Sequence, residues 1–212
     1  MDDLFFIRSI KENISFNVPM YIGCSILDIS KILMLQFYYG YMKPKYGDNF
    51  NCIYSDTDSY LFEVFTKDLY QDIYNDKHLF DLSDVKIKKF QDNTNKKVLG
   101  KMKCETGFIP ILEFCSLAPK LYSFITQNRK NKKIGKGISK QVLRDSLTHE
   151  NYKHILTSNE TITKPQINIR SKNHVLFTTI ENKKTLTSYD NKMHRNGDVN
   201  LPFGHYLLNQ TR

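Results

Sequence analysis

Two aspartates separated by one residue form the pattern in this chain that most directly suggests chemistry. Asp56 and Asp58 stand between two short apolar runs, residues 50–53 and 60–65, which predict the two strands of a hairpin. Side chains two residues apart in an extended segment point the same way, so we expect both carboxylates to project together from the hairpin tip. Two acids this close repel each other unless a cation lies between them, and hard oxygen ligands suit Mg²⁺. The pattern favours a metal site for phosphoryl or nucleotidyl transfer.

A short Asp-x-Asp pattern also has plainer interpretations, because most such pairs are solvated turns or caps. A calcium-binding loop is excluded, since Leu61 occupies the sixth position counted from Asp56, where the sharp turn of such a loop requires glycine. We expect the neighbouring Tyr54, Thr57 and Ser59 to support the hairpin by packing or capping it. A metal role for the two aspartates therefore depends on the sequence around them.

The surrounding sequence contains further blocks in a definite order. Residues 54–59 read Tyr-Ser-Asp-Thr-Asp-Ser, and residues 23–31 before them read Gly-Cys-Ser-Ile-Leu-Asp-Ile-Ser-Lys. The remaining blocks are residues 42–47, 80–84, 95–103, 120–123, 136–138 and 203–206. In their order and spacing these blocks resemble family B DNA polymerases, in particular the protein-primed branch found in Polinton or Maverick transposons, adintoviruses and related phages, and the resemblance extends over nearly the whole chain. The block at 54–59 is similar to the third palm motif of that family.

The resemblance implies an α+β fold. In such a fold an antiparallel palm sheet with packed helices is followed by a small thumb of helices and a β-hairpin. Residues 1–131 would form the C-terminal part of the palm, and residues 132–212 a thumb-like region and tail. The polar and charged run at residues 128–133 is typical of a hairpin tip or linker, and it places the boundary near Lys132.

The resemblance also implies roles for the motif residues. Asp58 would coordinate Mg²⁺ directly in a two-metal site, and Asp56 would support it electrostatically or through water. In that reaction the metals lower the pKa of the primer 3′ hydroxyl, align it with the α-phosphate and neutralise charge on the leaving pyrophosphate. The chain would thus be a DNA-directed DNA polymerase, a nucleotidyltransferase, by resemblance.

Residues farther along the chain match DNA-binding segments of the same family. Lys120 and Tyr122 match a Lys-x-Tyr segment that contacts the primer terminus and its phosphates, and their spacing would place both on one strand face. Lys136 and Gly137 match a following Lys-Gly-Ile block, in which glycine permits close approach of backbone to phosphate. We therefore expect primer–template DNA as a partner, together with deoxynucleoside triphosphates and a terminal protein primer.

Two motifs that such polymerases need do not occur in this sequence. One is the first palm motif, which supplies another metal-binding aspartate, and the other is a fingers motif of the form Lys-x-x-x-Asn-Ser-x-Tyr-Gly. Lys31 followed by the Tyr-Gly pair at 39–40 departs from the fingers motif, because Leu35 occupies the asparagine position. The two-metal site is therefore incomplete, and we expect the chain alone to be inactive.

Charge is unevenly divided along the chain, whose formal net charge is +9. Residues 1–85 carry 7 Lys and Arg against 13 Asp and Glu, whereas residues 86–140 carry 14 against 3. The lysines of residues 86–103, including Lys96 and Lys97, are interleaved with apolar residues that predict a strand over 97–103, so several should share one sheet face. A solvated surface is the ordinary explanation of a lysine run. Beside paired acids, a basic face suits primer–template DNA, because neutralised phosphates release counterions without any reading of sequence.

Several features indicate an intracellular protein. The four cysteines show no Cys-x-x-Cys pairing and are expected to be reduced. Asp2 and Asp3 stand where a secretory signal would have lysines, so we expect no export. The apolar stretch of residues 20–41 contains Asp28 and Lys31 near its middle, which predicts an amphipathic helix packed on a sheet, with no membrane association. By resemblance, the location would be the nucleus or a viral replication site.

The remaining pattern predicts the other elements. Apolar residues recur at three- and four-residue steps from Ile26 to Tyr41, indicating a helix that ends near Pro44. Strands are expected at residues 109–116 and 119–126, the second beginning at Pro119. The expected N-caps are Thr66 for a helix through Tyr74, Ser139 for a helix through Leu147, and Thr148 for a helix through Ile155. Residues 166–170 and 174–180 predict a further hairpin.

Two other functions are consistent with these residues. The chain could be a non-catalytic DNA-binding remnant of a transposon or viral polymerase, which would bind DNA in a salt-dependent way without incorporating nucleotides. It could also be a metal-dependent nuclease that uses Asp56 and Asp58, which would need further acids converging on the site and would degrade DNA.

Overall fold

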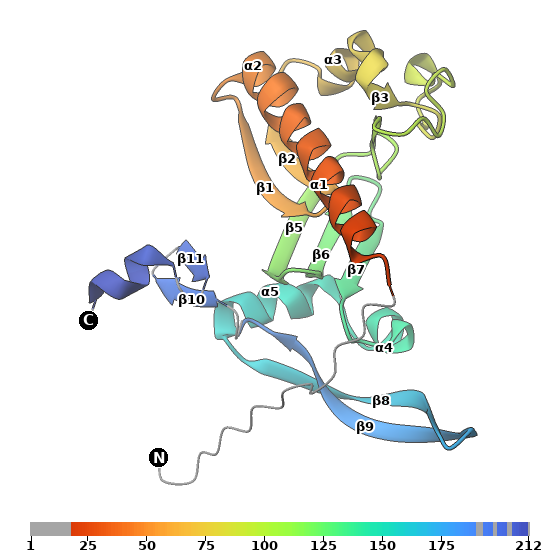
Figure 1. Cartoon of the computed structure of the whole chain (residues 1–212), viewed down its shortest axis with the longest axis vertical. Helices are drawn as coiled ribbons and strands as arrows, with labels where there is room; N and C mark the ends of the chain where they lie inside the picture. The colour runs from red at the N-terminus through yellow and green to blue at the C-terminus, as the bar shows by residue number, and fades with distance from the viewer. Residues whose placement is uncertain (1–17, 190–192, 197–198, 203–204, 212) are drawn as a thin grey trace. The chain divides into compact units, whose positions relative to one another are not determined.

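The computed structural model describes residues 18–189, 193–196, 199–202 and 205–211, and the chain forms two compact units, residues 1–69 and 70–212. Figure 1 labels the elements. The first unit contains α1 (Met20–Phe37), the π-helical turn η1 (Tyr38–Met42), α2 (Lys43–Tyr46), β1 (Phe50–Asp56) and β2 (Ser59–Val64). The two strands form an antiparallel hairpin, as the sequence predicts.

The core of the first unit lies between the end of the helix and the hairpin. Met42, Tyr46 and Phe50 are buried there, each less than 9 % exposed. Aromatic side chains from both sides pack around them, and the Tyr38 and Phe62 rings lie 6.1 Å apart. A two-stranded hairpin is only marginally stable by itself in water, so this packing on the helix is what stabilises β1 and β2.

The helix continues past Pro44, where the sequence predicted its end. The wider π-helical turn η1 directly precedes Pro44, which lies at the start of α2; such turns and prolines are both places where the regular hydrogen-bond ladder of a helix is interrupted. The helix ends instead at Gly47, whose φ of 59° is readily adopted by glycine.

The expected packing of the whole helix on a sheet is wrong for most of α1. Met34 is its one buried residue, whereas Ile26 is 61 %, Ile29 58 % and Leu33 42 % exposed. Among the described residues, the helical segment Met20–Tyr46 alone is long and apolar enough to cross a membrane, judged by length and composition. Core helices of soluble proteins meet the same criteria, so the expected lack of membrane association stays a prediction.

The second unit is built from several small sheets and helices. Its first part contains α3 (Leu69–Asn75, which begins one residue before the unit), η2 (Lys77–Leu79), β3 (Phe80–Asp81), η3 (Lys88–Phe90) and β4 (Met102–Lys103). A three-stranded antiparallel sheet of β5 (Ile111–Ala118), β6 (Leu121–Thr126) and β7 (Asn131–Gly135) follows, and then α4 (Lys140–Asp145) and α5 (His149–Ser158). The chain continues through the hairpins β8 (Thr161–Lys172) with β9 (Val175–Thr187) and β10 (Met193–Asn196) with β11 (Val199–Pro202), and through the 3₁₀ turn η4 (Tyr206–Thr211). Apart from the short parallel pair β3–β4, the sheets are antiparallel, so the coarse α+β class is confirmed.

The main core of the second unit lies where α5 packs on this three-stranded sheet. Tyr152 and Ile155 of α5 are fully buried against Cys115 of β5. The expected N-caps of both helices are confirmed: Ser139 accepts a hydrogen bond from the Val142 N–H, and Thr148 forms a capping box with Asn151. The predicted hairpin is also present as β8–β9, although both strands are longer than expected.

The predicted strand over residues 97–103 and its basic face are wrong. Only Met102 and Lys103 are extended, and Lys96 and Lys97 lie in turns. Lys97 has a φ of 59° and donates its backbone N–H to Asp81, while Leu99 is 97 % exposed. A buried carboxylate therefore organises this segment as a loop, and its lysines do not share one sheet face.

Three smaller differences concern element ends. Thr66 lies three residues before α3 begins, so it is not the N-cap of that helix. Pro119 lies in the turn between β5 and β6 rather than at a strand start. Lys132, where the palm–thumb boundary was predicted, lies inside β7, and the division between the two compact units follows Leu69.

Candidate functional site

The two aspartates occupy the tip of the β1–β2 hairpin. Asp56 is the last residue of β1 and is half-buried, while Asp58 lies in the turn and is exposed. Thr57 between them has a φ of 50°, and the Asp58 N–H donates to the Asp56 carbonyl at 2.6 Å. A tight three-residue turn thus separates the carboxylates, so they do not follow one extended strand as the sequence suggested.

A β-bulge precedes the turn. Cys52 pairs with Phe62 and Tyr54 pairs with Leu61, so Ile53 is one extra residue on β1. Bulges occur frequently next to active sites, where they re-aim a side chain. The sequence does not reveal this bulge, because an extra residue leaves no mark in a short apolar run.

The bulge decides which way Asp56 faces. Residues paired across a hairpin share a face, and Tyr60 with its partner Ser55 shares the face of Phe62, which packs on the helix. Asp56 pairs with Ser59 on the opposite face. If Ile53 were paired and the strand alternated regularly from Cys52, Asp56 would share the face of Cys52 and Phe62, towards the aromatic core, where burying a carboxylate would be costly.

Short polar side chains brace the turn. The Thr57 hydroxyl donates to Asp56 Oδ1 at 3.2 Å, and the Ser59 hydroxyl donates to the Asp56 carbonyl at 3.1 Å. Tyr54 is half-buried on β1. These contacts agree with the supporting role expected for the residues around the two acids.

The hairpin tip carries two carboxylates, which are side chains of the type that bind hard cations. Carboxylate oxygens are the ligands that Mg²⁺ prefers, and Asp58 is exposed enough to reach one. Among the described residues, no group of three or more His, Cys, Asp and Glu side chains could hold a metal ion. For Mg²⁺, which takes six ligands, Asp56 and Asp58 alone would leave most of the coordination sphere to water or phosphate oxygens.

In the second unit, the structure brings together four residues that the sequence linked to DNA. Lys120 lies in the β5–β6 turn with a φ of 60°, and its carbonyl accepts the Lys136 N–H at 2.9 Å. Gly137 follows with a φ of 83°, and Tyr122 of β6 pairs with Ile134 of β7. All four residues lie at one end of the three-stranded sheet, although Lys120 is in a turn and not on the strand face expected for it.

Lys96 and Lys97 belong to a separate loop held by acidic and amide side chains. Asn95 donates to the carbonyls of Lys77 and Phe80, at 2.8 and 3.1 Å. Asp81 accepts from the Lys97 N–H at 3.2 Å. The two lysines are exposed on this loop. Their placement comes from hydrogen bonds over 15 or more residues, which local patterns do not reveal.

Asp81 is the anchor of that loop. Burial would raise the pKa of its carboxyl, but hydrogen bonds from Ser83 and from the Lys97 backbone, with the Lys103 ammonium 3.8 Å away, lower it to about 2. The carboxylate is therefore charged throughout the physiological range, and its charge is satisfied inside the fold.

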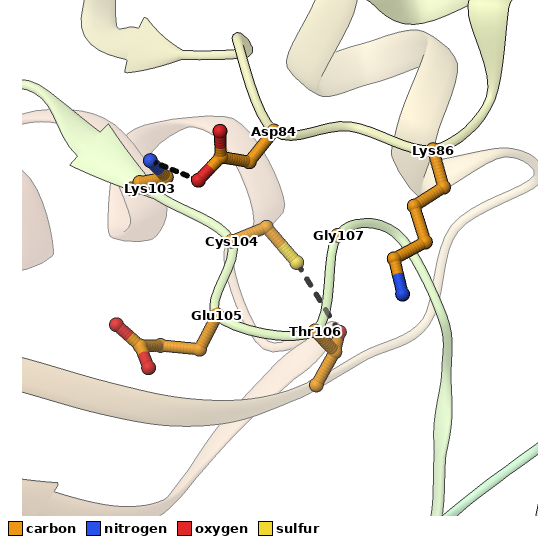
Figure 2. A pocket seen from close by; sticks show the side chains of 7 residues that line it. All are labelled: Asp84, Lys86, Lys103, Cys104, Glu105, Thr106 and Gly107. Atoms are coloured by element: carbon orange, nitrogen blue, oxygen red, sulfur yellow. Dashed lines mark hydrogen bonds and ion pairs between the residues drawn. The ribbon is translucent and has the colours of Figure 1, made fainter.

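A cavity of about 630 Å³ lies beside this loop (Figure 2). Lys103 pairs with Asp84 at its edge, and the Lys86 side chain packs along Gly107. The lining residues are Asp84, Lys86, Lys103, Cys104, Glu105, Thr106 and Gly107. Two lysines are balanced by two acids, so the cavity does not concentrate positive charge as a phosphate site requires.

A serine, a histidine and an acid also meet in the second unit. Ser123 Oγ lies 2.9 Å from His149 Nδ1, and His149 Nε2 lies 3.5 Å from Glu113 Oε2. Ser123 is completely buried and His149 is 2 % exposed, so no substrate reaches the hydroxyl. This arrangement joins α5 to the sheet, and it is not a nucleophilic triad.

Comparisons with known proteins do not identify the chain. No protein-family model matches it, and no curated protein and no solved structure matches it.

Proposed function

We propose that this chain carries the third palm motif and part of the primer-binding surface of a family B DNA polymerase of the protein-primed branch. The observation that carries the proposal is the pair Asp56 and Asp58 at the tip of an antiparallel hairpin, with a bulge that turns Asp56 away from the aromatic core. The resemblance of the surrounding sequence blocks supports the same function.

Within this proposal, the exposed Asp58 binds Mg²⁺ and Asp56, braced by Thr57, supports it. Bound Mg²⁺ would lower the pKa of a primer 3′ hydroxyl and neutralise charge on the leaving pyrophosphate. The first palm motif and the fingers motif are not in this sequence, so the metal site is incomplete and the isolated chain does not extend a primer.

The DNA-binding part of the proposal depends on the turn that joins the strands of the three-stranded sheet. Lys120 and Lys136 are adjacent there, and Gly137 leaves open space for a phosphate to approach the backbone. Tyr122 is the second residue of β6 and would contact the primer backbone. Exposed Lys96 and Lys97 add sequence-independent contacts to phosphate.

The finer architecture belongs to the same proposal. The β1–β2 hairpin and the three-stranded sheet would be parts of the palm, and α4, α5 and the β8–β9 hairpin would be parts of the thumb. The partners would be primer–template DNA, deoxynucleoside triphosphates and a terminal protein primer. The protein would act inside the cell, in the nucleus or at a viral replication site.

The DNA surface is tested by fluorescence anisotropy with a labelled primer–template at several salt concentrations. Lys120→Asn removes the charge while keeping a residue that tolerates positive φ, and Lys136→Gln removes the neighbouring charge. Each variant should weaken binding by at most about 1.5–3 kcal/mol and reduce the salt dependence, whose logarithmic slope changes by roughly 0.9 for each lost phosphate contact.

Lys153→Gln is the matched control, because the Lys153 charge is already paired with Glu113 at 3.0 Å. If Lys153→Gln weakens binding while Lys120→Asn and Lys136→Gln are silent, the proposed surface is the wrong one. Affinity that does not change between low and moderate salt would also count against it.

The metal role has its own test. Asp58→Asn should leave metal-free DNA binding intact or slightly tighter, because it removes negative charge near phosphates. In a polymerase reconstituted with the two missing motifs, the same variant should eliminate incorporation while DNA stays bound. Nucleotide incorporation by the isolated chain with Mg²⁺ or Mn²⁺ would refute the prediction that its metal site is incomplete. Salt-dependent binding without incorporation, even in the reconstituted polymerase, would instead indicate a non-catalytic remnant.

A further inference from the structure

The Asp56–Asp58 hairpin is joined to the helix near its tip by a tyrosine outside the metal-binding pair. The Tyr60 hydroxyl donates to the Met34 carbonyl of α1 at 3.2 Å. Tyr60 pairs with Ser55, and the next pair towards the tip is Asp56 with Ser59. This hydrogen bond is thus one residue pair from the end of the hairpin.

The Tyr60 ring is held on both sides by aromatic neighbours. Its centroid lies 4.9 Å from that of Phe62 on the same strand and 5.9 Å from that of Tyr38 on the helix. Aromatic pairs at such separations add about 0.5–1.5 kcal/mol beyond their buried area. The ring therefore has a defined position, and the hydroxyl is directed at one acceptor.

The acceptor, the Met34 carbonyl, lies in the last turn of α1, directly before the π-helical turn. Met34 is the one buried residue of α1, and its carbonyl also accepts the N–H of Tyr38, where the π-helical turn begins. A carbonyl oxygen has two lone pairs and can accept both hydrogen bonds. The helix thus offers a rigid reference point opposite the hairpin tip.

The position of Tyr60 relative to the acids is what gives this contact a role. Tyr60 faces the helix, whereas Asp56 lies on the opposite face of the hairpin. Tyr60 therefore does not obstruct a cation at the carboxylates, but it restrains the strand that carries the far side of the turn. Ligands held in place before binding give a tighter metal site than ligands that must be ordered on binding.

We propose that Tyr60 is a positioning residue, which holds the Asp56–Asp58 turn in its metal-binding geometry through the hydrogen bond to Met34. The inference rests on the proposed metal role of the two aspartates. The hydroxyl of Tyr60, and not its ring, sets the affinity of the hairpin for a divalent cation.

The test is the affinity of the full chain for Mn²⁺, measured by paramagnetic broadening of the backbone amides of residues 56–59. Tyr60→Phe keeps the ring and removes only the hydroxyl, and it should weaken Mn²⁺ binding about three- to tenfold. Tyr39→Phe is the matched control, since Tyr39 is 60 % exposed on the same helix, and it should leave the affinity unchanged.

A second measurement separates positioning from general stability. The thermal midpoint of Tyr60→Phe should stay within a few degrees of the wild type, and amides of the second unit should be unshifted. Equal Mn²⁺ affinity in the wild type and Tyr60→Phe would overturn the role of Tyr60 while leaving the metal site in place. If Mn²⁺ does not broaden residues 56–59 in the wild type, the metal role of Asp56 and Asp58 is itself wrong.

Discussion

Replacing Asp81 by asparagine should loosen the loop that carries Lys96 and Lys97. The Asp81 side chain is buried and accepts the Ser83 N–H at 2.9 Å and the Lys97 N–H at 3.2 Å. An asparagine can keep one of these acceptors, but its NH₂ group would face the other donor. The variant therefore loses a charge-assisted hydrogen bond and leaves a buried N–H unpaired.

The magnitude follows from the pKa of the carboxyl. Hydrogen bonds and the Lys103 ammonium outweigh burial and lower this pKa from 3.8 to about 2. Each pKa unit corresponds to about 1.4 kcal/mol, so the charged form contributes about 2.5 kcal/mol at neutral pH. Because the folded-state pKa is the lower one, this contribution is complete above the unfolded pKa near 4 and is lost as pH falls towards 2.

The assay is urea unfolding of the wild type and Asp81→Asn between pH 7 and pH 2.5, followed by circular dichroism, with hydrogen exchange of the Lys97 amide as the local measurement. We expect a difference of about 2 kcal/mol at pH 7 that shrinks towards zero at the acid end. Asp84→Asn is the control: Asp84 is 67 % exposed and pairs with Lys103, so its loss should cost less than about 1 kcal/mol. A difference for Asp81→Asn that is below about 0.5 kcal/mol at pH 7, or that does not depend on pH, would refute the reasoning.

Three further predictions concern the second unit. Thr148→Ala removes the capping box with Asn151 and should destabilise the chain by about 1 kcal/mol in chemical denaturation; an unchanged midpoint would contradict the role of the cap. Burial raises the pKa of Tyr152 to about 12, so the contribution of this group to stability should be constant below pH 10 and fall by up to about 2.5 kcal/mol by pH 12, a fall that Tyr152→Phe should not show in alkaline unfolding curves. Gly135→Ala places a methyl group against the Ile138 side chain and should cost about 1–3 kcal/mol, with part of the loss recovered in a double variant with Ile138→Ala; simple additivity of the two changes would argue against the clash.

Much of the local structure was predictable from the sequence. The hairpin around Asp56 and Asp58, the caps Ser139 and Thr148, and the β8–β9 hairpin follow from short-range patterns. Alternation, capping and turn chemistry act within a few residues, so the residues involved are neighbours in the sequence itself. The metal role of the two aspartates at the hairpin tip stays a prediction.

The orientation of that pair was decided by tertiary structure. The bulge at Ile53 places Asp56 on the face opposite the aromatic core, and the hydrogen bond from Tyr60 to Met34 spans 26 residues. Neither feature can be recognised from neighbouring residues. A bulge is defined by its pairing with the other strand. The acceptor of the Tyr60 hydroxyl, the Met34 carbonyl, lies in a helix much earlier in the sequence.

The lysines show the same division between local and distant causes. The lysine run predicted a basic strand, but the loop conformation of Lys97 comes from Asp81, 16 residues away, whose burial makes its hydrogen bonds obligatory. Conversely, Lys120 and Lys136 were predicted to bind DNA from two separate sequence blocks. Strand pairing in the second unit makes them neighbours. The sequence by itself determined which residues carry charge and which local elements form. Only the tertiary structure decided which of those charges meet, because burial and strand pairing join residues that the chain keeps apart.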